Sequence, residues 1–247
     1  MPSRSVDIVL NGIGSDLKLF LPIPIVIAQN GSAKLGLKNF NTFNSIPNVH
    51  QNVNNTLKIK IPSETNWHVF ELPSGSYDLT EINERIWEWL ETSRGLVDGR
   101  KNFILIGSNA TGCCSFIFKQ NYSVDFDVKN SIGKLLGFDK SSFEGVGRHE
   151  AEKPAKLCAA NQLHFNCNVI EGSFFKRKQV PLLYSCNLDV PPGCKITREI
   201  SQISYKKCNS HQLSYFHVWI EDEQFNLIDL RNDALIVTLS LVIDEED

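Results

Sequence analysis

The side chains best suited to catalysis in this chain are its seven cysteines and six histidines. A cysteine becomes a nucleophile when a histidine lies within hydrogen-bond reach, and the two need not be neighbours in the sequence, so such a pair stays open. A zinc site is disfavoured, because no C-x-x-C pair and no zinc-ligand spacing occur. The cysteines are Cys113, Cys114, Cys158, Cys167, Cys186, Cys194 and Cys208.

Known catalytic motifs do not occur in the sequence. It has no G-x-S-x-G turn, no G-x-x-x-x-G-K-[ST] loop and no H-E-x-x-H helix. The dipeptide His149-Glu150 begins like the last motif, but Ala-Glu-Lys follows it, so the second metal-binding histidine is missing. We therefore predict that the protein is not an enzyme, with no catalytic residues, no metal site and no cofactor.

The other polar candidates have structural interpretations. His217 lies in a segment of alternating residues and is predicted to be a core-edge or interface histidine, as is His164. Cys113-Cys114 could form a vicinal disulfide, but two free thiols are favoured. The acidic stretch 222–229 lacks the glycine-centred loop of a calcium site and is predicted to be a hydrophilic hairpin.

Composition is typical of a folded globular protein: 42% of the 247 residues are hydrophobic, and the net charge is −3. This charge gives no overall attraction to nucleic acid, so no specific nucleic-acid binding is predicted. The basic cluster Lys176-Arg177-Lys178 is interpreted as a solvated loop, or else as a contact with an acidic neighbour or a genome phosphate. Because no apolar leader and no run of about 18 apolar residues occur, we expect no membrane span and reduced thiols.

The elements that must position these residues are mostly β-strands, as alternating apolar and polar residues indicate. One helix is expected over 79–92, because Asp78 and Glu81 have capping-box spacing and apolar residues recur on one face. A short helix is expected over 131–137, closed by its last residue, a glycine. The polar stretch 139–156 is predicted to be a loose surface loop.

The last third of the chain indicates the fold class. Apolar segments bounded by turn residues follow one another with almost no helix signal, over 163–170, 182–188, 213–220 and 234–243. A β-sandwich needs such segments, because each sheet buries one face on the other. We predict a mainly β fold, a β-sandwich with one or two short inserted helices, and an acidic tail at 244–247.

Several of these segments match patterns that occur together in one family. Residues 122–138 match one pattern and end in Asn-Ser-Ile-Gly-Lys-Leu-Leu-Gly-Phe, and four further stretches match, at 35–48, 72–83, 190–196 and 218–231. Together they resemble a protein family carried by Polinton (Maverick) elements and the related adintoviruses. The chain departs from the family pattern at Phe225, where the pattern has glycine, and at Asn232-Asp233, where it has Gly-Glu.

This resemblance implies a virion structural protein. The elements are similar to the adenovirus and virophage lineage, in which a double jelly-roll protein forms the major shell and a single jelly-roll minor capsid protein forms pentons at the five-fold vertices. With 247 residues the chain is short for two jelly rolls of eight strands each, so the penton type is expected, as one jelly-roll domain over 1–247.

The resemblance also implies partners and a location. The expected partners are further copies of the chain, as a homopentamer, and the major capsid protein of the same element. The expected location is the virion capsid, assembled in the nucleus or cytoplasm of the host cell. A ring of five needs a heterologous interface, and the loops expected at its contacts are 44–54, 139–156 and 172–179.

Three alternatives stay open. The chain could be a major-shell capsid subunit of the same lineage. It could be a non-viral β-sandwich binding module for carbohydrate or a protein ligand, which an exposed aromatic groove would favour. It could also be a cysteine protease, which would require one cysteine beside a histidine in a cleft.

Overall fold

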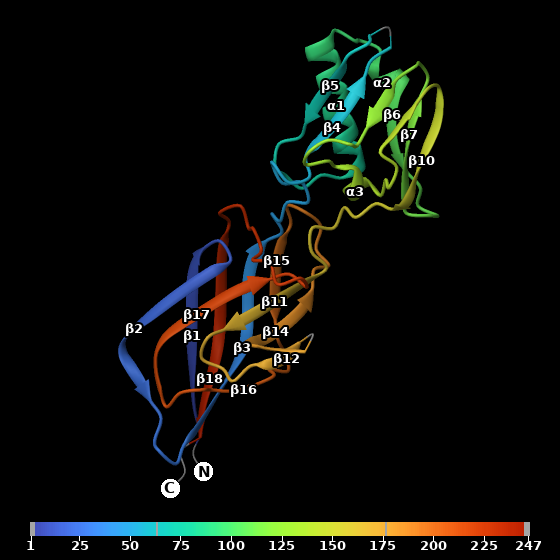
Figure 1. Ribbon diagram of the computed structural model, residues 1–247. Helices are drawn as coiled ribbons and strands as arrows, with labels where there is room; N and C mark the ends of the chain where they lie inside the picture. The colour runs from blue at the N-terminus through green and yellow to red at the C-terminus, as the bar shows by residue number, and fades with distance from the viewer. Residues whose placement is uncertain (1–2, 63, 176, 245–247) are drawn as a thin grey trace. The chain divides into compact units, whose positions relative to one another are not determined.

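The computed structural model describes residues 3–62, 64–175 and 177–244. Within them the chain divides into two compact units. Unit 1 is built from residues up to Ile46 and from Ala160 onward, and unit 2 from Pro47–Ala159. In Figure 1 unit 1 is coloured blue and orange to red, because both ends of the sequence form it, while unit 2 has the colours of the middle.

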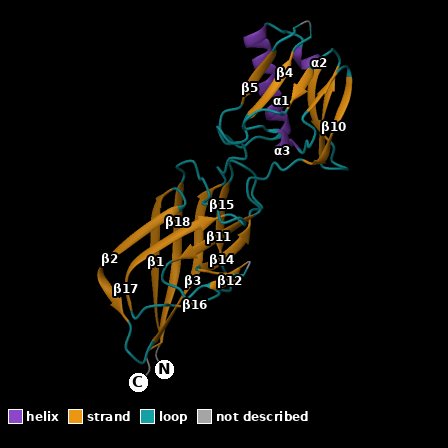
Figure 2. Cartoon of the chain, viewed as in Figure 1, coloured by secondary structure: helices purple, strands orange, loops and turns teal. Residues whose placement is uncertain are grey.

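Unit 1 consists of β-strands, as Figure 2 shows. The strands from its first segment are β1 (Ser3–Ile13), β2 (Asp16–Val26) and β3 (Ser32–Phe43). Those from its second segment are β11 (Gln162–Cys167), β12 (Ser173–Phe175), β13 (Lys178–Val180), β14 (Leu182–Asn187), β15 (Lys195–Glu199), β16 (Lys206–Lys207), β17 (Gln212–Glu221) and β18 (Ala234–Asp244).

Eight of these strands form the two sheets of a jelly roll. The first sheet has the order β1-β18-β3-β15, with the short β16 also paired to β3, and the second has the order β14-β11-β17-β2. The first strand lies antiparallel to the last over its whole length, from Ser3 opposite Asp244 to Ile13 opposite Ala234. Two four-stranded sheets with this connectivity are a jelly roll, so the predicted fold class is confirmed.

Strict alternation builds the core between the two sheets. In β18, Leu235, Val237, Leu239 and Leu241 are completely buried, while the residues between them are more exposed or face the outer side. From β3 and β11, the rings of Phe40 and Phe165 meet with centroids 4.4 Å apart. Such interdigitated aliphatic and aromatic side chains supply most of the stability of a sandwich.

Gly36 in β3 lets a connecting segment cross the outer face of the first sheet. A Cβ at this position would overlap the side chain of Ile203, and Tyr205, two residues further on, hydrogen bonds to Ser240 Oγ at 3.2 Å. We expect Gly36→Ala to lower the free energy of unfolding by roughly 1–3 kcal/mol, through overpacking. Urea denaturation would measure it. Adding Ile203→Ala should recover part of the loss, and an additive double variant would contradict the proposed overlap.

Unit 2 combines two small sheets with a helix. Its strands are β4 (Thr56–Lys60), β5 (Trp67–Glu71), β6 (Phe103–Gly107), β7 (Cys113–Phe118), β8 (Ser123–Asp125), β9 (Ser142–Glu144) and β10 (Gly147–Pro154). Its helices are α1 (Leu79–Arg94), α2 (Gly99–Asn102) and α3 (Gly133–Leu136). The sheets have the orders β5-β4-β8-β9 and β10-β7-β6.

Helix α1 begins and ends where its sequence signals lie. Asp78 accepts a hydrogen bond from the Glu81 backbone N–H at 2.7 Å, and the Glu81 carboxylate accepts one from Asp78 N–H at 2.8 Å. Gly95 closes the helix in the left-handed conformation. The helix packs on β6, where the Trp87 indole N–H donates to Phe103 O at 2.6 Å and Asn83 Oδ1 accepts from Leu105 N–H.

The single jelly-roll domain expected over 1–247 stays a prediction. Within the described residues, the segment between β3 and β11 is a compact unit with its own core, centred on Phe103, Phe116 and Phe118. We also expected a loose loop over 139–156, which instead contains β9 and β10. The short helix expected over 131–137 is the single turn α3. Of the predicted acidic tail at 244–247, Asp244 ends β18 and residues 245–247 lie outside the described residues.

Candidate functional site

Four of the seven cysteines are placed as structural rather than nucleophilic groups. All seven are free. Burial raises the pKa of Cys114 and of Cys167 to about 12, and that of Cys186 and of Cys208 to about 11. A thiolate is the attacking form of cysteine, and these four thiols keep their protons at neutral pH. The Cys114 thiol donates to the Leu136 carbonyl oxygen at 2.8 Å. The favoured pair of free thiols at Cys113-Cys114 is confirmed.

Thiol exposure gives a prediction. Cys158 and Cys194 are exposed, whereas Cys114, Cys167 and Cys208 are buried. We expect two fast-reacting thiols in the native protein at pH 8 and full reactivity only after denaturation, measured with a chromogenic disulfide reagent. The double variant Cys158→Ser/Cys194→Ser should lose the fast phase. A fast phase that survives in this variant would mean that a half-buried thiol, Cys113 or Cys186, or a buried thiol is accessible.

The acidic stretch 222–229 organises a turn. The Asp222 carboxylate accepts from the backbone N–H groups of Gln224 and Asn226, at 2.7 and 2.9 Å, and the Asp229 carboxylate accepts from Arg231 N–H. Short hydrogen bonds of this kind satisfy carboxylates locally. Among the residues the structure describes, no group of three or more His, Cys, Asp or Glu side chains is arranged to hold a metal ion.

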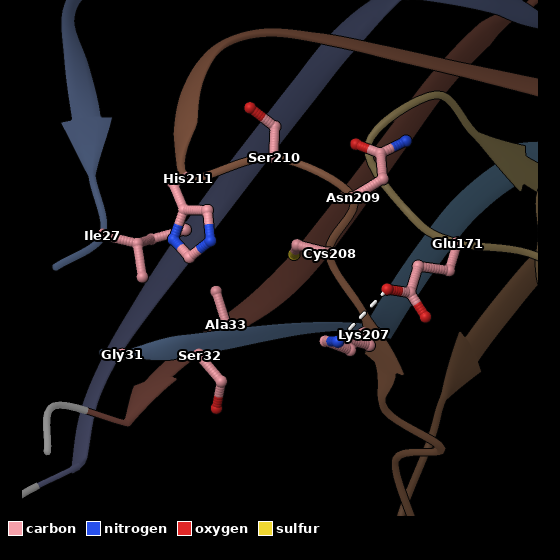
Figure 3. Close-up of a pocket in the computed structure, with 10 residues that line it drawn as sticks. All are labelled: Ile27, Gly31, Ser32, Ala33, Glu171, Lys207, Cys208, Asn209, Ser210 and His211. Carbon is pink, nitrogen blue, oxygen red and sulfur yellow. Dashed lines mark ion pairs between the residues drawn. The ribbon is translucent and has the colours of Figure 1, made fainter. Parts of the chain in front are cut away.

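A pocket of about 350 Å³ lies beside the connections that follow β2, β11 and β16, away from the candidates above. Figure 3 shows the ion pair between Lys207 Nζ and Glu171 Oε1, 3.3 Å apart, on one wall and His211 beside Ile27 on the other. The Asn209 amide donates to the carbonyl oxygens of Asn168 and Ile170. The asparagine and the ion pair therefore hold connecting segments together, and they do not converge on a common point.

The outer face of the second sheet carries a row of rings, which we term the aromatic row: Phe20, Tyr215, His217 and Trp219. The ring centroids of Phe20 and Tyr215 lie 4.5 Å apart, and those of His217 and Trp219 lie 4.7 Å apart. His217 Nε2 lies 2.9 Å from Asp16 Oδ1, which holds the imidazole in place. His217 is half-buried on this face, whereas His164 on β11 is fully buried beside Gln162.

Strand β2 extends this face with exposed apolar side chains. The exposed fractions of Phe20, Ile23 and Val26 are 72, 79 and 72%. The pairing with β17 shifts between Leu213, opposite Ile25, and Tyr215, opposite Phe20, so residues 21–24 bulge at the edge of the sheet. Two prolines in this bulge remove backbone donors, as is usual on an edge strand. We term Phe20, Ile23 and Val26 the β2 patch.

The three predicted contact loops differ from one another in the structure. Residues 44–54 include Asn48, which donates to Tyr77 O and Leu157 O within unit 2, at 2.7 and 2.8 Å. Residues 139–156 are mainly strands. Residues 172–179 form most of the β12–β13 hairpin, where Phe174 is 82% exposed. Lys176 of the basic cluster lies outside the described residues, while Arg177 and Lys178 are exposed.

Sequence reasoning did not single out the aromatic row or the β2 patch. Their signal was present, since β2 reads Leu-Phe-Leu-Pro-Ile-Pro-Ile-Val and contains more apolar residues than one buried face requires. The apolar side chains of β2 that face outward, together with the alternate rings of β17, form the most apolar exposed surface on this sheet.

Comparison with known proteins supports the fold. No protein-family model matches the chain, and no curated protein matches it by sequence. Among solved structures, it is similar to the crystal structure of a mavirus penton protein, with a TM-score of 0.51 and 10% sequence identity. The match covers 97% of this chain and 99% of the other, so it includes both units. At this identity the similarity shows a shared, penton-like jelly-roll fold. Across the described residues, no helix has the length and apolar character needed to cross a membrane.

Proposed function

We propose that this chain is a virion structural protein, a penton-type minor capsid subunit that forms the five-fold vertices of an icosahedral capsid of a Polinton- or adintovirus-like element. One observation carries the proposal: the fold agrees with that of a mavirus penton protein over nearly the full length of both chains. The sequence patterns at 35–48, 72–83, 122–138, 190–196 and 218–231 support the lineage independently.

The architecture favours the penton type over a major-shell subunit. A double jelly-roll protein needs two eight-stranded sandwiches. Unit 1 supplies one, but unit 2 has sheets of the orders β5-β4-β8-β9 and β10-β7-β6 with a helix packed on β6. Unit 2 is thus an insertion in a single jelly roll. Raised pKa values of four cysteines also speak against the cysteine protease alternative.

The proposal includes the binding partners of the subunit and its location. The subunit associates with four further copies of itself and with the major capsid protein of the same element, within the capsid of the virion. Assembly takes place in the host cell. A rigid sandwich suits this role, because it holds its connecting loops and edge strands at fixed positions relative to one another.

Light scattering of the purified chain, combined with negative-stain imaging, tests the proposal. Closed rings with five times the 27.9 kDa subunit mass, about 140 kDa, are the expected result. Trimers would favour the major-shell alternative. A monomer at every concentration, even after the major capsid protein is added, would contradict the capsid role and favour a binding module.

A further inference from the structure

One exposed feature of unit 1 lies at an edge of the second sheet, and another is a separate hairpin that precedes the strand at the opposite edge. In the order β14-β11-β17-β2, the β2 patch occupies one edge. At the other edge, β14 follows directly after the β12–β13 hairpin, which ends at Val180. When copies of such a sheet stand side by side in a ring, the β14 edge of one copy faces the β2 edge of the next. The contact is heterologous, which is the type that closes a ring.

The β2 edge has the character of an unfilled interface. Three large apolar side chains within seven residues, each more than 70% exposed, exceed the scattered apolar exposure of a typical monomer surface. The aromatic row continues this surface, since Phe20 stacks on Tyr215. The carboxylates of Asp16 and Glu221 lie on the same face of the sheet, where Asp16 pairs with Trp219 and Glu221 pairs with His164 in the neighbouring strands. One ammonium group, that of Lys18, lies on this face as well.

The hairpin offers the complementary chemistry. Phe174 is 82% exposed near the hairpin tip, and Arg177 and Lys178 follow it, both exposed. An aromatic ring packs well against a row of rings, and cationic side chains are attracted to both aromatic faces and carboxylates. The hairpin therefore carries an aromatic ring with two cations, and the β2 edge carries rings with carboxylates in excess over ammonium groups.

We propose that the β12–β13 hairpin of one copy docks on the β2 patch and aromatic row of the next copy, with Phe174 against the rings and Arg177 and Lys178 toward Asp16 and Glu221. The inference rests on the proposed self-association and assigns the surfaces that mediate it. It also gives Arg177 and Lys178 a role: they contact an acidic, aromatic neighbour in the ring.

The test uses two variants of the full chain, each lacking one surface. Phe20→Ser/Ile23→Ser removes most of the β2 patch, and Phe174→Ser/Lys178→Glu removes the hairpin chemistry. Each alone is expected to weaken assembly roughly 100-fold or more and to leave a monomer, as loss of central aromatic anchors does. Mixed together, they retain one intact pair of surfaces, so a 1:1 heterodimer of about twice 27.9 kDa is expected by light scattering.

A matched control is Val97→Ser, which alters an apolar side chain that is 82% exposed in unit 2 and should leave assembly unchanged. Unaltered circular dichroism and thermal midpoints show that the variants fold. If the wild type forms rings and either double variant still does, or if the mixture stays monomeric, this assignment of surfaces is overturned while the proposed function stands. If the wild type never self-associates, the proposed function fails, and the interface fails with it.

Discussion

Replacing Phe40 with alanine is expected to destabilise unit 1 by roughly 3–5 kcal/mol and to leave unit 2 almost unchanged. The Phe40 side chain is completely buried, and its ring packs against Phe165 from the opposite sheet at 4.4 Å. Truncation removes this cross-sheet contact and leaves a cavity that two hydrogen-bonded sheets close only partly. A loss of this size approaches the total free energy of unfolding of many domains.

The matched substitution in unit 2 is Phe116→Ala. Its ring is equally buried and contacts Phe103, Phe118, Phe126, Phe138 and Phe143, with centroids between 5.3 and 6.5 Å away. Native-state hydrogen exchange, read by peptides from each unit, measures both effects in one experiment. Each substitution should lower protection only in its own unit. Equal losses in both units from either substitution would show a single cooperative core.

Alkaline pH is expected to destabilise the protein through its buried thiols. The unfolded thiols ionise near pH 9, but the folded Cys114 and Cys167 ionise only near pH 12, so folded chains bind more protons between these values. Stability is therefore fully present below pH 9 and falls as the pH rises toward 12. The slope is about 1.4 kcal/mol per pH unit for each thiol, or several kcal/mol by pH 11.

Urea midpoints measured from pH 7 to pH 11 test this slope. Cys114→Ala/Cys167→Ala should make the profile less steep and leave the part due to Cys186 and Cys208, even though the substitution itself lowers stability at pH 7. Cys158→Ser/Cys194→Ser changes only exposed thiols and should leave the slope as it is. Burial also raises the pKa of Tyr122, which adds to the loss above pH 10. A flat profile in the wild type would contradict the buried, protonated state of the two thiols.

The sequence predicts the structure best where a local pattern is compatible with only one kind of element. Alternation in 234–243 correctly predicts β18, because a half-buried strand needs period two. The capping box at Asp78 and Glu81 fixes the start of α1 to the residue. The jelly roll itself came from the family resemblance, since alternation shows which residues face a core but not which strands are neighbours.

The division into two units was not predictable by this route. Strands of unit 2 alternate as strands of unit 1 do, so the sequence pattern assigns both to one sandwich. Strand β10 was missed for a different reason: it is the edge of the β10-β7-β6 sheet and is exposed at most positions, so Gly147–Pro154 has the composition of a loop. Because only one side of β10 is buried, its sequence contains too few apolar residues to indicate a strand.

Two residues at which the chain departs from the family pattern have left-handed backbone. Phe225 and Asn232 stand where the pattern has glycine, and both adopt positive φ, 68° and 64°. Left-handed backbone is disfavoured for residues with a Cβ, and more so for phenylalanine than for asparagine. The backbone at these two residues therefore has a local energetic cost, which the surrounding hydrogen bonds of Asp222 and Asp229 help to offset.

The pairing of β1 with β18 governs how the chain can fold as it leaves the ribosome. Because Ser3 pairs with Asp244, the edge of β1 that pairs with β18 has no partner until nearly all the described residues have been synthesised. Unit 2, continuous in sequence, can complete its core much earlier. Such long-range closure is slow, and it leaves the apolar β1 and β3 edges uncovered in the meantime. During translation these strands therefore present a binding site for chaperones, and their aggregation competes with folding.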